Sequence, residues 1–98
     1  MFIRPNAVMS TEVDKRVSLF KIYIDLRISD YPLLREGNLD GDLANFRSQL
    51  ANFTRDITAA ANKMLSDFVP KKAGEEELLK SKLMAVIGNS RERFARQQ

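Results

Sequence analysis

The sequence predicts an all-α protein, an antiparallel three-helix bundle dominated by a long helical hairpin. The first reason is a repeat, since Leu-Ala-Asn-Phe at residues 43–46 recurs at residues 50–53. Seven residues make two helical turns, so both copies lie on one face of a helix. The second reason is that turn-forming residues break the chain on either side of this segment. A composition of 44% hydrophobic and 30% charged residues is typical of a folded protein.

The longest predicted helix covers residues 42–68. Its apolar residues continue from the repeat in steps of three and four as far as Met64, which is a coiled-coil-like seam. Asp40 or Asp42 is expected to cap its start. Pro70 ends it, because proline cannot continue the backbone hydrogen bonding and restricts the residue before it.

A second helix is predicted over residues 75–95. Three glutamates at 75–77 stand at its start, where the helix dipole favours negative charge. The short connection between the two helices implies that they lie antiparallel. We expect an apolar core between them, formed by Phe46, Leu50, Phe53, Ile57 and Met64 of the first helix and Leu79, Leu83, Val86 and Ile87 of the second.

The N-terminal segment fits two periods. At the helical period, apolar residues from Val13 to Tyr31 form one stripe. At period two, apolar and polar residues alternate between Phe20 and Ile28, as in a strand. We favour the helix, because the sequence offers no second strand. The alternative is an N-terminal strand over residues 19–28 that pairs in a dimer and is followed by two helices.

The helical interpretation leaves a second apolar face on this N-terminal helix. Its members are Leu19, Ile22 and Leu26, which lie opposite the first stripe. A helix that is apolar on two sides has to bury both, and a three-helix bundle supplies only one core. The sequence therefore predicts self-association through these three residues, as a homodimer or a larger oligomer.

The chain is long enough for one domain, so we expect a single helical domain over residues 1–98. Residues 1–10 are expected to form a loose N-terminal arm, in which Met9 is an alternative start. Residues 91–98 are expected to form a basic C-terminal tail. The N-terminus lacks the apolar core of a signal peptide, and no apolar run is long enough to span a membrane. We therefore expect a cytoplasmic protein that makes no membrane contact.

The composition also limits the chemistry. The chain has no Cys and no His, so it lacks thiolate ligands, the commonest general base and the commonest metal ligand. No pattern of nucleophile and base and no glycine-rich phosphate loop is present. We therefore expect no enzymatic activity, no metal site and no cofactor.

The last third of the chain is basic, with seven Lys or Arg and four Glu over residues 71–98. Nucleic acid could use it, although with weak and non-specific affinity because few phosphates would be neutralised. Arg47, Arg55 and Lys63 are expected to be spread around the preceding helix instead of joining this group. The expected phosphate contacts are Lys80, Lys82, Arg91, Arg93 and Arg96.

These observations predict a small, non-enzymatic helical interaction protein. It would act as an adaptor, a regulator or an assembly component through contacts with a protein partner, and it would self-associate. The alternative is a nucleic-acid-binding accessory protein of the phage or plasmid type that uses the basic C-terminal third.

Overall fold

The computed structural model describes residues 11–36 and 42–95. Every regular element in these ranges is helical, which confirms the predicted all-α class. The elements are α1 (Thr11–Arg27), the short 3-10 helix η1 (Ile28–Asp30), α2 (Pro32–Glu36), α3 (Leu43–Asp67) and α4 (Glu75–Ala95).

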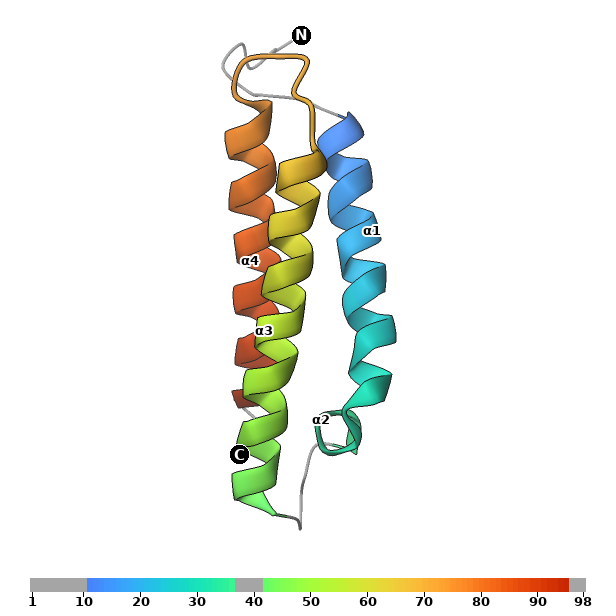
Figure 1. The fold of residues 1–98 in the computed structure, drawn as a ribbon, viewed down its shortest axis with the longest axis vertical. Coiled ribbons are helices and arrows are strands. Elements are labelled where there is room, and N and C mark those ends of the chain that lie inside the picture. Colours follow the sequence, from blue (N-terminus) through green and yellow to red (C-terminus); the bar gives the residue numbers. More distant parts are fainter. Residues whose placement is uncertain (1–10, 37–41, 96–98) are drawn as a thin grey trace, which may run out of the picture.

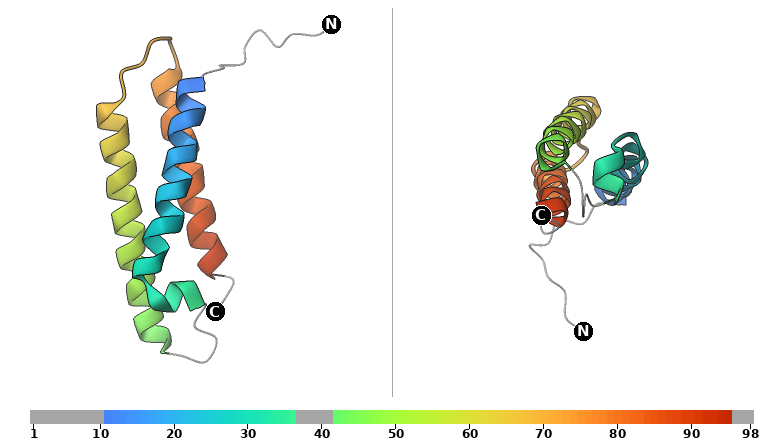
Figure 2. Two further views of the ribbon diagram at one scale, coloured as in Figure 1. Left: turned by 90° about the vertical axis from the view of Figure 1, so that its right-hand side faces the viewer. Right: turned by 90° about the horizontal axis from the view of Figure 1, so that it is seen from below.

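The three long helices lie side by side, and α3 runs in the opposite direction to α1 and α4 (Figure 1). Helix α1 packs against both α3 and α4, and α2 folds back beneath α1 onto α3. Seen from below, α1 lies to one side of the α3–α4 pair (Figure 2). Within the described ranges, no helix combines the length and the apolarity needed to cross a bilayer.

The alternative of a strand over residues 19–28 is wrong, because this segment is helical through Arg27 and continues into η1. Phe20 and Ile24 are buried, whereas Ile22 and Leu26 are exposed. A strand would place all four on one face, and a helix separates them into two faces. The helical period therefore prevails, since only Phe20 and Ile24 have a core to enter.

The ends of α3 and α4 lie within one residue of the predicted positions. The Asp42 side chain caps α3 by accepting a hydrogen bond of 3.2 Å from the Asn45 amide, and Asp40 lies outside the described residues. Helix α3 ends at Asp67, shortly before Pro70. Helix α4 continues without a break through Gly88 to Ala95.

The seam of α3 faces the core as predicted. Phe46, Phe53 and Ile57 are completely buried, while Leu50 and Met64 are half-buried against the same core. On α4, Leu79, Leu83 and Ile87 are buried, Val86 is half-buried, and Phe94 joins them. The four core residues of α1 are Val13, Val17, Phe20 and Ile24.

An aromatic cluster lies where the helices meet near the lower end of the bundle. The Phe53 ring makes edge-to-face contacts with Tyr31, at a centroid distance of 5.5 Å, and with Phe94, at 5.7 Å. Phe53 therefore joins the segment after α1 to both α3 and α4.

The Glu75 side chain stabilises the connection between α3 and α4 through hydrogen bonds to its backbone. This side chain is only 4% exposed, and its Oε1 accepts hydrogen bonds from the backbone amides of Lys71 (2.7 Å) and Lys72 (3.1 Å). Gly74 supplies the left-handed conformation at the turn, with φ of 88°. Glu75 thus does more than complement the helix dipole, whereas Glu76 and Glu77 are exposed as that role requires.

Candidate functional site

The main candidate site is the outer face of α1, defined by Leu19, Ile22, Tyr23 and Leu26. The exposed fractions of these residues are 57%, 54%, 37% and 68% in that order. They follow one another at steps of three, one and three, which places them on one side of a helix. Four large apolar side chains exposed together form a patch of the kind that marks an interaction surface.

The sequence builds this outer face by giving α1 two apolar stripes. One stripe, which includes Phe20 and Ile24, is fixed against α3 and α4. The helix then has to present Ile22 and Leu26 on the side away from the core. Figure 2 (left) shows α1 in front of the other two long helices. The predicted set of three therefore lies together. Tyr23 was missed, although its spacing of four from Leu19 was a readable signal.

The charged residues along the outer face have both signs. Lys15 lies one turn before Leu19 in line with the face, and Asp25 lies beside Leu26, both of them exposed. Asp14 lies on the same α4-facing edge of α1 as Asp25, three helical turns away, and it is paired with Lys82 of α4, with Nζ and Oδ1 3.0 Å apart. A surface with alternating signs can be complementary to a copy of itself turned end to end.

The predicted phosphate contacts are not brought together. Lys82 and Arg93 lie on the side of α4 that faces α1, where Lys82 is paired with Asp14 and the Arg93 guanidinium lies 5.2 Å from the centroid of the Phe94 ring. Lys80 and Arg91 share the opposite side of α4, because they are three helical turns apart. Arg96 lies outside the described residues.

The structure corrects one expectation about the basic residues. Arg47 and Arg55 of α3 were expected to remain apart from the C-terminal group, but both line one open groove with Arg91 of α4. The groove runs along the seam between the two helices. Its remaining lining residues are Leu50, Ala51 and Thr54. We call it the three-arginine groove.

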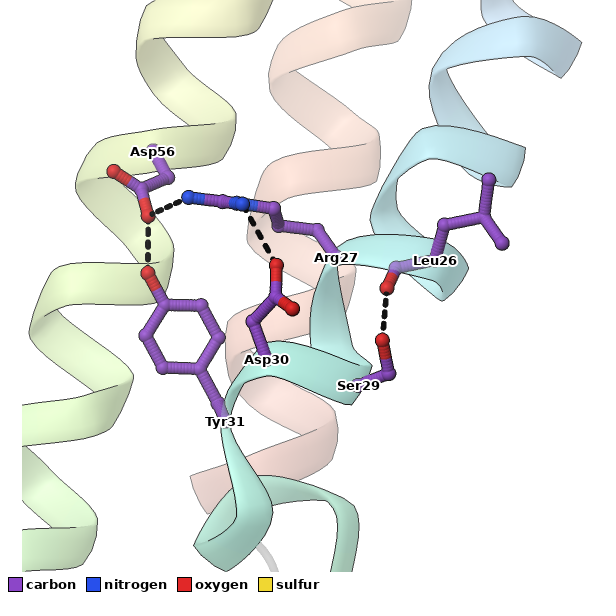
Figure 3. A network of polar contacts seen from close by, with 6 residues as sticks. All are labelled: Leu26, Arg27, Ser29, Asp30, Tyr31 and Asp56. Atoms are coloured by element: carbon purple, nitrogen blue, oxygen red, sulfur yellow. Dashed lines mark hydrogen bonds and ion pairs between the residues drawn. The ribbon is translucent and has the colours of Figure 1, made fainter.

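A polar network ties the segment after α1 to α3 (Figure 3). The Arg27 guanidinium donates to Asp30 (2.7 Å) and to Asp56 of α3 (3.1 Å). The Tyr31 hydroxyl donates a hydrogen bond to the same Oδ2 of Asp56. Asp56 therefore accepts hydrogen bonds from Arg27 and Tyr31 and links the end of α1 to α3.

The charges in this network change the pKa values of its members. The hydrogen bond from Tyr31, followed by the one from Arg27, lowers the pKa of Asp56. Burial, followed by the hydrogen bond to Asp56, raises the pKa of Tyr31. The hydrogen bond to Asp56 also raises the pKa of Arg27. Each shift favours the protonation state that holds the network together, which is a structural role.

The described residues hold no group of three or more acidic side chains that could bind a metal ion. Comparison with protein-family models, with curated protein sequences and with solved structures finds no match for this chain.

Proposed function

We propose that this protein is a small, non-enzymatic interaction module that acts as an adaptor, a regulator or an assembly component and self-associates through the outer face of α1. The observation that carries the proposal is the exposure of Leu19, Ile22, Tyr23 and Leu26 on one face. Leaving this much apolar surface in water costs free energy that association recovers. A rigid helix that is already packed on its inner side loses little entropy when it docks.

The proposed arrangement is an isologous dimer in which two α1 helices lie antiparallel. A two-fold axis between Leu19 and Ile22 puts each of these residues against the other in the second copy. In the same arrangement, the aliphatic stem of Lys15 covers Leu26 of the second copy, and its ammonium group approaches Asp25. In this arrangement, Lys15 of each copy thus pairs with Asp25 of the other.

The alternative function, nucleic-acid binding, draws less support from the positions of the basic side chains. A phosphate backbone is bound best by a continuous basic surface. The predicted contacts are divided between two sides of α4, and Lys82 already has an acidic partner in Asp14. This division favours protein contacts over contacts with a long polyanion.

Sedimentation equilibrium tests the proposal. The wild-type protein should form dimers at micromolar concentration, and the double variant Leu19→Lys/Leu26→Lys should be a monomer with unchanged far-UV circular dichroism. Ala59→Lys, at an exposed position on α3, is the matched control and should remain dimeric. A wild-type protein that stays monomeric at every concentration would overturn the proposal.

A further inference from the structure

We propose that the three-arginine groove is a second docking site, which takes an acidic amphipathic helix from another protein. This inference rests on the proposal that the protein acts through protein contacts, but it does not depend on self-association. The groove lies on the other side of α3 from Asp56, the residue that reaches toward α1, because Thr54 and Asp56 differ by roughly 200° around the helix. Both surfaces can therefore be occupied at once.

The charge of the groove identifies the sign of its partner. Three of the six lining residues are arginines, and none is acidic. Arg47 and Arg91 make no hydrogen bond or ion pair with any other described residue, whereas Arg55 donates a hydrogen bond of 3.0 Å to Asn52 and also interacts electrostatically with Asp56. Guanidinium groups bind carboxylates through paired hydrogen bonds, so a groove in which two of the three arginines have no acidic partner among the described residues fits a carboxylate-bearing ligand.

The floor of the groove favours a protein over a nucleic acid. Leu50 is half-buried and Ala51 is exposed, so the surface between the arginines is apolar. The side chain at its centre, Ala51, is small. Met84, 41% exposed, lies two turns before Arg91 on the same face of α4, so an exposed apolar side chain follows the groove along this helix. A phosphate backbone would leave these groups against charged oxygens, whereas the apolar face of a helix buries them.

The spacing of the arginines fits a helical ligand. Arg47 and Arg55 are eight residues apart on α3, which is about 12 Å along the helix axis. Two carboxylates separated by two turns on a docked helix span nearly the same distance, about 11 Å. The small side chain of Ala51 between them allows a helix to approach closely, as helix packing requires.

The test is a fluorescence anisotropy titration with a defined probe. The probe is a labelled peptide of about 18 residues, built from Glu, Leu and Ala so that it forms an amphipathic helix of about 27 Å. The control peptide has Lys in place of every Glu. We expect the acidic peptide to bind and the basic peptide not to bind.

Two protein variants separate the groove from general electrostatic attraction. Arg47→Glu/Arg91→Glu should weaken peptide binding by about tenfold or more, because it replaces attraction with repulsion at both sides of the groove. Lys63→Glu/Lys72→Glu makes the same change in net charge at exposed positions elsewhere and should change binding by less than about threefold. Equal effects of the two double variants would overturn the proposal.

A third variant tests the apolar floor without changing the charge. Ala51→Trp fills the centre of the groove at an exposed position, so the protein should keep its helical content while peptide binding weakens. Unchanged binding by Ala51→Trp would overturn the proposal. Tighter binding of a labelled DNA duplex, lost on Arg47→Glu/Arg91→Glu, would overturn it in favour of a nucleic-acid site. The monomeric variant Leu19→Lys/Leu26→Lys should bind the peptide as the wild type does, which keeps this result separate from the test of self-association.

Discussion

Replacing Phe53 by Ala tests the core at the place where α3 contacts both α4 and the segment after α1. Phe53 is completely buried, and its ring contacts Tyr31 and Phe94 edge to face at 5.5 and 5.7 Å. Removing a buried phenyl ring costs about 3–5 kcal/mol, because the transfer energy is lost and a cavity remains. A domain of this size has a free energy of unfolding of about 5–15 kcal/mol, so the variant loses a large share of it.

Urea unfolding followed by far-UV circular dichroism measures this loss. With an m-value of about 2 kcal/mol per molar urea, the midpoint should fall by about 2 M. Leu43→Ala is the control, since Leu43 begins the same sequence repeat but is 42% exposed, and it should cost less than about 1 kcal/mol. A loss of about 1 kcal/mol or less for Phe53→Ala would refute the view that Phe53 joins the helices.

Three other features give independent predictions. A lowered pKa of Asp56 in the folded state adds stability above the unfolded value of about 3.9, and this stability is lost as the pH falls through the folded value. When the pH is lowered below about 4, the urea midpoint of the wild type should therefore decrease, and that of Asp56→Asn should decrease less. Parallel curves of urea midpoint against pH would contradict this. Tyr31→Phe removes one donor to that carboxylate and should cost about 1 kcal/mol at pH 7 by urea unfolding. Gly88→Ala should raise the free energy of unfolding by about 1 kcal/mol, because a Cβ there meets nothing within 4 Å and Ala favours a helix; a thermal melt with no upward shift would be inconsistent with a continuous α4. Glu75→Ala leaves two loop amides without their carboxylate and should cost about 1–3 kcal/mol in urea unfolding, against less than about 0.5 kcal/mol for the exposed Glu76→Ala.

Local signals predicted most of the fold. Asp42 and Pro70 act on neighbouring backbone groups, so the limits of α3 could be read from the sequence. The apolar period of α3 is likewise a local property, and Phe46 and Phe53 are buried where it placed them. The N-terminal segment was ambiguous because its apolar residues satisfy both periods. Only packing against α3 and α4 distinguishes the buried Phe20 from the exposed Ile22.

Which residues form the candidate sites could be predicted less well, because these residues are far apart in the sequence and come together only in the folded structure. Arg47 and Arg91 are 44 positions apart in the chain, and they line one groove only because of the register between α3 and α4. Arg27 and Asp56 are 29 positions apart, and their pairing depends on where α1 crosses α3. The outer face of α1 was more accessible to prediction, since all of its members lie on one helix.

The two apolar stripes of α1 have a thermodynamic consequence. Because Phe20 and Ile24 hold α1 on the hairpin while Leu19 and Leu26 lie on its back, any molecule bound to the back also opposes the detachment of this helix. Detachment exposes the inner stripe and leaves α1 as an isolated helix, which is only marginally stable in water, so the outer face is lost with it; association and the docking of α1 are therefore linked equilibria. With the self-association proposed above, the amide hydrogens of α1 should exchange more slowly as the protein concentration rises, while those of the α3–α4 hairpin should depend on it less. A partner that binds α1 would thus also stabilise the packing of α1 against the α3–α4 hairpin.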